Sequence, residues 1–395
     1  MMLKASSLLC VSREGFVRVT EQKKRNIGRK KPCQAERERL RGAKYRPVKR
    51  NITIDALKGW GIYFVVMGHF IYNTYAIFLI PEQSVYITKF IYSFHMPLFF
   101  VISGYCNAWS LYKYNTQQYF IRKTKSLLIP FFFWTMSAVA LNLIYFRNDP
   151  DIRTVFCRLM LQCFVYTPSV WYFLILYLST LIFRVDIVFG NILAKKFNPK
   201  FRILSHLLFW FFIILLPNDI FTFLWFEHLY PYFILGYYLN IYSNELAVHI
   251  EKNLSKIVFI SLLFIPMTVL GYVFDFPPLH SDVTFVDSYS FLYANIWALT
   301  GCLFSYMLVK HCLTKLSSIR SLCVSFGEYS LDIYGIHMVL VRNLNFIPLL
   351  IFMIRPVFLM IINPVYCVFV CIIITVLSKL VLHKVRLYSI LFSGR

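Results

Sequence analysis

The sequence has few charged residues, and it lacks any long polar segment after its first fifty residues. Only 15% of the 395 residues are charged, whereas 58% are hydrophobic. A soluble domain is usually about half apolar, with roughly a quarter of its residues charged. Apolar runs of about 18 or more residues, the length that crosses a bilayer, recur along the chain. These features exclude a soluble globular domain and predict a polytopic, multi-pass membrane protein.

Acidic residues are also scarce, with 18 Asp and Glu against 41 Lys and Arg, which gives a net charge of +23. Such a balance can indicate a nucleic-acid partner, but its distribution argues against one. Residues 1–50 hold 16 Lys/Arg and 4 Asp/Glu, a net of +12, and most other basic residues lie between apolar runs. Positive charge in short loops orients membrane proteins. We therefore expect no nucleic-acid partner.

Paired cysteine spacings and a signal peptide are lacking as well. Several of the ten cysteines lie inside apolar segments, which is typical of small buried side chains and not of a disulfide framework. We expect no metal site. The apolar stretch "SSLLCV" is too short for a signal peptide. The sequence therefore predicts that residues 1–50 form a basic, poorly ordered cytoplasmic arm that contacts anionic membrane lipids.

What the sequence does contain is a series of about ten candidate membrane spans, which predicts an all-α integral membrane protein. The fifth and sixth candidates form a tight hairpin through the turn Pro217-Asn218-Asp219. The candidates are residues 53–73, 86–111, 126–146, 169–186, 203–217, 221–241, 255–274, 288–310, 324–342 and 357–383.

The loops between these candidates alternate in charge, which predicts the orientation. Basic loops such as "KYNTQQYFIRKTK" and "AKKFNPKFR" fall on the side of the N-terminus, whereas "NTYAIFLIPEQS" and "DFPPLHSDVTFVDS" on the other side lack Lys and Arg. The segment 147–168, which contains three arginines, is the exception. The pattern places both termini in the cytoplasm. It predicts one membrane domain, residues 51–385, followed by a cytoplasmic tail, residues 386–395, in a plasma or inner membrane.

The first candidate span, "DALKGWGIYFVVMGHF", carries three titratable residues that a membrane helix normally avoids. Lys58 and His69 are eleven positions apart, so they share one helix face at a separation of about 16 Å. Asp55 lies three residues before Lys58 and can pair with it. A neutral imidazole can act as a general base. A histidine that only bonds to a neighbouring helix is the structural alternative.

Three other polar groups stand out. Arg122 and Lys125 precede Pro130 and suit either a topology anchor or a cytoplasmic phosphate site. The pair Glu227-His228 suits either an interfacial anchor or a substrate contact. The segment "FGEYSLDIYGIH" places Glu328, Asp332 and His337 in an otherwise apolar span.

The second candidate span also contains small residues. In "SFHMPLFFVISGY", Ser103 and Gly104 predict close helix packing.

Together these segments resemble membrane acyltransferase family 3, in particular its fucose 4-O-acetylase-like branch. The resemblance is carried by "ITIDALKGWGIYFVVMGHF", "FHMPLFFVISGY", "RKTKSLLIP", "WYFLILYL", "YFILGYYL" and "FGEYSLDIYGIH", in that order. The family pattern of Arg or Lys, ten residues and His falls on Lys58 and His69. Its arginine pair falls on Arg122 and Lys125, where the second position departs from the pattern.

The resemblance implies a membrane O-acetyltransferase, which transfers acetyl from acetyl-CoA to a sugar hydroxyl of a surface polysaccharide or a lipid-linked glycan. His69, Lys58 and Asp55 would be the catalytic group, and Arg122 and Lys125 would hold the phosphates of the acyl-CoA donor. Weaker candidates for substrate contacts are Glu227, His228 and His337. The alternative is a transporter or flippase for a lipid-linked glycan or small solute, because intramembrane His, Asp and Glu also suit a proton relay.

Overall fold

A computed structural model describes residues 51–78, 83–145, 147, 150–161, 170–198, 201–216, 223–278, 288–343, 363–385 and 388. Throughout these residues the regular structure is helical, and no strand occurs in them. The predicted arm 1–50, the turn at residues 217–219 and almost all of the tail 386–395 lie outside the described residues. The expectation of an all-α fold is confirmed for the part of the chain that is described.

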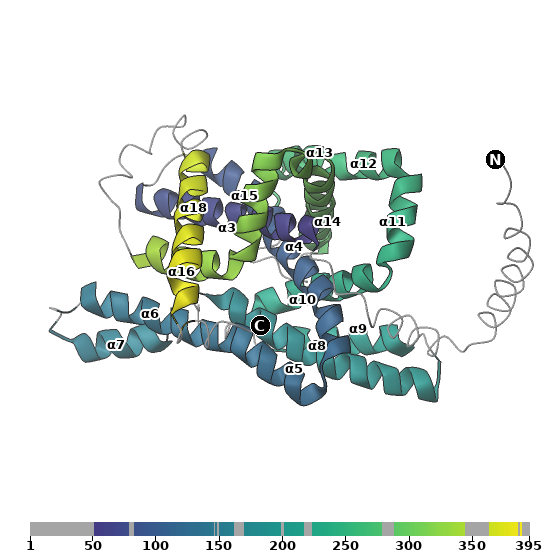
Figure 1. Cartoon of the computed structure of the whole chain (residues 1–395), viewed down its shortest axis with the longest axis horizontal. Coiled ribbons are helices and arrows are strands. Elements are labelled where there is room, and N and C mark those ends of the chain that lie inside the picture. Colours follow the sequence, from purple (N-terminus) through teal and green to yellow (C-terminus); the bar gives the residue numbers. More distant parts are fainter. Residues whose placement is uncertain are drawn as a thin grey trace, which may run out of the picture. The chain divides into compact units, whose positions relative to one another are not determined.

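Figure 1 labels the helices in chain order. The first half of the described chain contains α3 (Ile52–Phe78), α4 (Gln83–Lys113), α5 (Thr116–Lys123), the π-helical turn η2 (Thr124–Leu128), α6 (Ile129–Tyr145), α7 (Ile152–Leu161), α8 (Trp171–Lys196) and α9 (Phe201–Ile214). The second half contains α10 (Phe223–Ile241), α11 (Ser243–Lys252), α12 (Leu254–Leu262), α13 (Phe264–Val273), α14 (Ser288–His311), η4 (Leu313–Lys315), α15 (Ser317–Glu328), α16 (Ser330–Asn343), α18 (Asn363–Leu380) and η7 (Leu382–Lys384).

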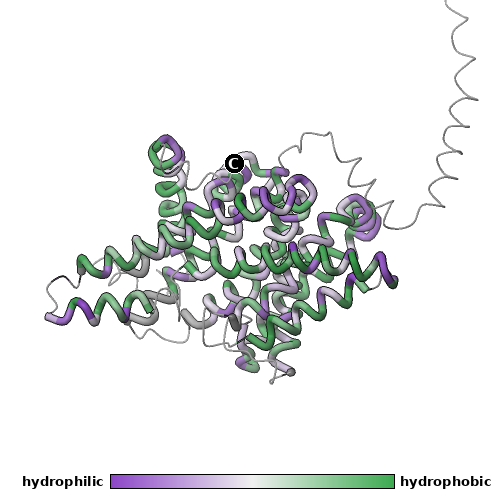
Figure 2. The backbone as a smooth tube through the Cα atoms, turned by 90° about the horizontal axis from the view of Figure 1, so that it is seen from below, coloured by the Kyte–Doolittle hydropathy of each residue, from purple (hydrophilic) through white to green (hydrophobic). Residues whose placement is uncertain are grey.

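Each of the ten predicted spans overlaps a helix, but the helices differ in how well they suit a bilayer. Among the described residues, six helical stretches are long and apolar enough to cross a membrane. Two shorter apolar helices cover residues 201–214 and 330–340, and α3 with its titratable residues is not among the six. Figure 2 shows hydrophobic residues along most of the helices and hydrophilic ones more often near their ends. The protein is therefore a multi-pass membrane protein, while the count of ten spans stays a prediction.

Two predicted segments differ from the helices that form. The ninth candidate span is broken at Tyr329, which separates α15 from α16. The basic stretch before the third span was expected to be a loop, but it forms α5 and continues through η2 into α6. Asn115 caps α5, because its side chain accepts a hydrogen bond from the Gln118 amide at 2.8 Å. A π-helical turn inside a helix is often found at functional sites.

Helix α3 is the central element around which the site is built (Figure 1). It packs against α4, α14, α15, α16 and α18. Its crossing with α15 has glycine on both sides: a Cβ at Gly59 would overlap the Cys323 carbonyl, and a Cβ at Gly327 would overlap the Asp55 carbonyl. Only glycine permits this separation of the two backbones. The crossing brings Lys58 on α3 close to the break between α15 and α16.

A second close crossing joins α4 to α10. A Cβ at Gly104 would overlap the Phe233 carbonyl, and one at Gly236 would overlap the Val101 carbonyl. The close packing predicted from Ser103 and Gly104 is thus confirmed. Helix α4 is held at this crossing, and it supplies one wall of the cavity described below.

The chain divides into two compact units. One includes residues 187–205, where the Phe197 and Phe201 rings are in contact with centres 5.3 Å apart and a tilt of 34°. The larger unit includes residues 51–186 and 206–395 and contains every residue of the candidate site.

Candidate active site

The larger unit encloses a cavity of about 350 Å³ between α3, α4, α8 and the break between α15 and α16. This volume is at the lower end of the range of small-molecule sites, about 300–1,000 Å³. Most of the wall is apolar, and the residues that form it include Ile62, Val65, Met96, Phe99, Leu127 and Leu176. Polar lining residues include Lys58 on α3, Glu328 at the end of α15, Ser330 and Asp332 at the start of α16, and His383 in η7.

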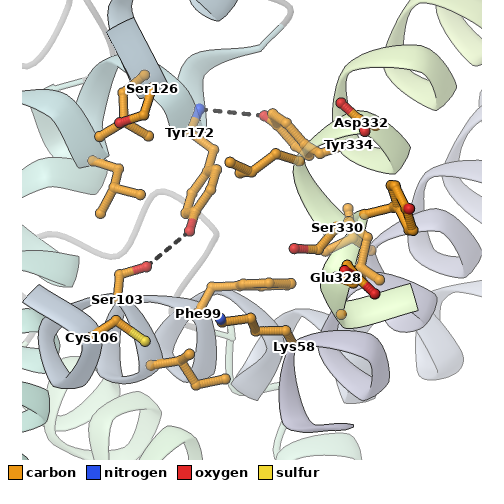
Figure 3. Close-up of a pocket in the computed structure, with 18 of the residues that line it drawn as sticks. Lys58, Phe99, Ser103, Cys106, Ser126, Tyr172, Glu328, Ser330, Asp332 and Tyr334 are labelled. Atoms are coloured by element: carbon orange, nitrogen blue, oxygen red, sulfur yellow. Dashed lines mark hydrogen bonds between the residues drawn. The ribbon is translucent and has the colours of Figure 1, made fainter. Parts of the chain in front are cut away.

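Lys58 and Asp55 form the ion pair that their spacing predicts. The Lys58 Nζ lies 3.3 Å from the Asp55 Oδ1, and both side chains are partly buried. Figure 3 shows Lys58 beside Phe99, with the Glu328 and Ser330 side chains near Lys58 and the Tyr172 side chain across the cavity from them. An uncompensated ammonium inside a membrane protein is costly, so the Asp55 carboxylate stabilises the Lys58 charge beside the cavity.

Two tyrosines form a hydrogen-bonded wall on the other side of the cavity. The Tyr172 hydroxyl and the Ser103 hydroxyl lie 3.1 Å apart, and the Tyr172 amide donates to the Tyr334 hydroxyl at 3.3 Å (Figure 3). The two tyrosine rings meet edge to face, with centres 5.4 Å apart. Both residues are buried. The bonds fix both rings, so this part of the wall is rigid.

A carboxylate–histidine pair that the sequence analysis missed also borders the cavity. Asp332 pairs through Oδ2 with the His383 Nε2 at 2.7 Å, and its Oδ1 accepts a hydrogen bond from the Tyr388 hydroxyl at 2.6 Å. Burial raises the pKa of Tyr388 above its ordinary value, and the nearby charge of Asp332 raises it further. Tyr388 thus stays protonated and donates. The signal in the sequence was too weak to find, because residues 332 and 383 are far apart in the chain.

Three histidines gather beyond the cavity. The rings of His69 on α3 and His337 on α16 have centres 5.5 Å apart, and His337 is completely buried. His337 also contacts Tyr334 at 5.8 Å between ring centres, so the histidine pair adjoins the cavity wall. His95 on α4 contacts Tyr92, which in turn contacts His69. Neither His69 nor His337 lines the cavity itself.

Arg122 and Lys125, the predicted phosphate ligands, lie on α5 and η2. The Arg122 guanidinium packs over the Tyr114 ring at 4.3 Å, and Lys125 is exposed. Neither residue lines the cavity, although the next two residues, Ser126 and Leu127, do. The π-helical turn therefore connects an accessible basic segment directly to the cavity wall.

Glu227 and His228 are buried on α10 and do not form an open surface. The His228 Nε2 lies 3.8 Å from the Glu227 Oε1, and His228 contacts Phe291. The Trp210 indole donates to the Glu227 carbonyl at 2.8 Å. A substrate contact through these two residues stays a prediction.

No group of three or more His, Cys, Asp or Glu side chains that could hold a metal occurs among the described residues. The site is therefore an apolar cavity with an ion pair at one side and a histidine pair adjoining its wall.

Comparison with known proteins identifies the family to which the chain belongs. The pattern of acyltransferase family 3, described as an acyltransferase domain, matches residues 51–383. The chain belongs to this family. Two curated relatives are similar over 90 residues each: Nodulation protein NolL of Sinorhizobium fredii (strain NBRC 101917 / NGR234), at 38% identity, and Nodulation protein NolL of Mesorhizobium japonicum (strain LMG 29417 / CECT 9101 / MAFF 303099), at 34% identity.

Each of these two alignments covers 22% of this chain and 23% of the relative. The chain thus matches less than a quarter of the length of the two curated relatives. No solved structure matches the chain. The family assignment therefore rests on the long match to the family pattern.

Proposed function

We propose that the protein is a membrane O-acyltransferase that transfers acetyl from acetyl-CoA to a sugar hydroxyl of a cell-surface polysaccharide or lipid-linked glycan. The observation that carries the proposal is the cavity between Lys58 and the Tyr172–Tyr334 wall, which adjoins the pair of His69 and His337. It lies within residues 51–383, the part of the chain that matches the acyltransferase family.

In this proposal the donor enters from the cytoplasmic side. Residues 1–50 and both chain ends lie in the cytoplasm, and ten spans of residues 51–385 cross a plasma or inner membrane. Arg122 and Lys125 bind the phosphates of the donor, since guanidinium and ammonium groups form charge-assisted bonds with phosphate oxygens. The acylated arm of the donor enters the cavity past Lys58, because its apolar walls suit an uncharged chain.

The acetyl group is then transferred at His69. This imidazole takes the proton of the sugar hydroxyl or carries the acetyl group for a short time. Asp55 holds Lys58 in place through their ion pair. Binding the donor near Lys58 and reacting near His69 separates the two events by about 16 Å along α3.

The experiment that tests this function measures both substrates. Membranes that contain the protein should release CoA from acetyl-CoA when the acceptor glycan is present, and cells that lack the protein should have less O-acetyl on their surface glycans. Membranes with the His69→Gln variant are the matched control. Transport of an intact glycan without any cleavage of acetyl-CoA would reject the proposal in favour of a transporter or flippase.

A further inference from the structure

His337 has one ring nitrogen in a hydrogen bond and the other without one. Its Nδ1 lies 2.7 Å from the carbonyl oxygen of Ile333, one helical turn earlier. Its Nε2 is buried and has no hydrogen-bond partner within the described part of the chain. A buried polar atom without a partner destabilises a protein, because it has lost its hydrogen bonds to water and gained none in return. Such an atom in a cluster of polar residues indicates a role beyond packing.

The bond to Ile333 decides which nitrogen of His337 carries the hydrogen. A carbonyl oxygen can only accept a hydrogen bond, so Nδ1 must donate and must carry a hydrogen. In the neutral imidazole, Nε2 then has a free lone pair and acts as an acceptor. The side chain of His337 is thus fixed as a hydrogen-bond acceptor at Nε2.

The side chain considered as the donor to the His337 Nε2 is the neighbouring His69. The centres of the two rings are 5.5 Å apart and the rings are tilted by 43°. Two imidazoles that share an N–H···N bond of about 3 Å have ring centres roughly 5 Å apart. A small movement of the half-buried His69 ring would therefore join one of its nitrogens to the His337 Nε2.

We propose that His337 is a positioning residue, which accepts an N–H hydrogen bond from His69 and thereby fixes the tautomer of His69. The inference rests on the proposed function and assigns His69 the role of the base. With one nitrogen of His69 donating to His337, the other must present a lone pair to the acceptor hydroxyl. The carboxylate in a catalytic triad orients its histidine in the same way.

The transfer step balances with His337 unchanged. The hydroxyl gives its proton to the nitrogen of His69 that does not face His337, while its oxygen bonds to the acyl carbon. The C–S bond of the thioester breaks, and its electron pair remains on sulfur. His69 then gives the proton to the thiolate, so the products are an ester and a thiol. His337 stays neutral, because it only accepts a hydrogen bond throughout.

His95 provides a matched control within the same cluster. It is also buried, and its Nδ1 lies 2.8 Å from the carbonyl oxygen of Ile91, one turn earlier on α4. Its ring contacts Tyr92. A substitution of His95 thus changes a buried histidine with the same local hydrogen bond, and it leaves the His69–His337 pair in place.

The experiment compares His337→Leu, His337→Gln and His95→Leu with the wild-type protein in membranes, at matched abundance. The release of CoA is measured as a function of acetyl-CoA concentration, with the acceptor present. We expect His337→Leu to lower kcat roughly 10- to 100-fold, the usual effect of removing a partner that orients a functional histidine. The KM for acetyl-CoA should not change. His337→Gln should recover most of the loss, because its amide oxygen can accept the hydrogen bond in place of Nε2.

His95→Leu should keep a kcat near that of the wild-type protein. The positioning role is overturned if His337→Leu keeps the wild-type kcat, if His337→Gln is as slow as His337→Leu, or if His95→Leu is equally slow. These three results leave the proposed function standing. A wild-type protein that releases no CoA would instead overturn the proposed function, and the role of His337 with it.

Discussion

Two buried histidines in different regions of the molecule have opposite hydrogen-bond arrangements. On α9, His206 uses both ring nitrogens: Nδ1 pairs with the Asp186 Oδ2 at 2.6 Å, and Nε2 bonds to the Tyr238 hydroxyl at 2.7 Å. Tyr230 donates a further hydrogen bond to the same carboxylate oxygen at 3.2 Å. On α16, His337 uses one nitrogen, and its other nitrogen has no partner in the described residues.

This difference in hydrogen bonding assigns His206 to the stability of the fold and His337 to function. Both ring nitrogens of His206 are bonded, and its bonds join helices α8, α9 and α10 through Asp186 and Tyr238, so this histidine has no ring nitrogen left for a substrate. A buried histidine with an open acceptor destabilises the protein slightly and is ready to bind. We therefore expect substitutions around His206 to change stability, and substitutions around His69 and His337 to change turnover.

The largest effect should come from His69→Gln. An amide can form hydrogen bonds, but it neither accepts a proton near neutral pH nor forms a reactive acyl adduct. General-base catalysis contributes about 10²–10⁴ in rate, so turnover of acetyl-CoA should fall by at least that factor. Binding of acetyl-CoA and thermal stability in detergent should not change. A well-expressed His69→Gln protein with near wild-type turnover would show that His69 is structural.

The opposite result is expected for His206→Leu. Removing the imidazole takes away the hydrogen bond between the His206 Nδ1 and the completely buried Asp186 carboxylate. Breaking a buried pair in this way typically lowers the free energy of unfolding by about 3–5 kcal/mol. Thermal unfolding in detergent measures the loss, while turnover per folded molecule should stay the same.

The double variant Asp186→Asn/His206→Leu tests the cause of this loss. With the carboxylate replaced by a neutral amide, much of the lost stability should return, since the buried side chain no longer carries a charge. If the double variant is as unstable as the sum of both single variants, the pair is not the source of the effect.

A moderate effect on the KM for acetyl-CoA is expected for substitutions in the basic segment of α5 and η2. These substitutions test whether the functional site extends beyond the cavity. Arg122→Ala should raise the KM for acetyl-CoA roughly 10- to 100-fold with little change in kcat, because a charge-assisted bond to phosphate is worth about 1.5–3 kcal/mol. Lys125→Arg is the control, and it should be tolerated because the charge is kept. An unchanged KM in Arg122→Ala would leave these residues as topology anchors.

The smallest effect concerns the ion pair of Lys89 and Asp275, in which the carboxylate is exposed. Lys89 on α4 bonds to the exposed Asp275 after α13, and this hydrogen bond and charge lower the pKa of Asp275. A lowered pKa stabilises the folded protein above the unfolded pKa, and this stabilisation is lost as the pH falls through the folded pKa. Lys89→Met should therefore lower the melting temperature slightly at pH 7 and less at acidic pH. A difference that is constant with pH would contradict this origin.

Local sequence patterns could predict part of the site. The spacing of Asp55 and Lys58 predicts their ion pair, because residues three apart share a helix face. Ser103 and Gly104 predict a close helix crossing in the same way. The roles of His69, Arg122 and Lys125 remain proposals, since nothing in the geometry alone tests them.

Long-range contacts could not be predicted in this way. His69 and His337 share no sequence relation, and the ring contact depends on how α16 packs against α3. The pairs of Asp186 with His206 and of Asp332 with His383 were missed for the same reason. The break at Tyr329 was also missed, because an apolar run does not show where a helix ends.

The sequence by itself determined that the chain forms membrane helices, because apolar composition and run length decide this without any partner. It also determined which polar residues lie on one face of the first helix. Only the tertiary structure decided which histidine is satisfied and which is open. The hydrogen bonds of a buried imidazole depend on the neighbouring helices, and their arrangement follows from close crossings such as that of Gly59 with Gly327.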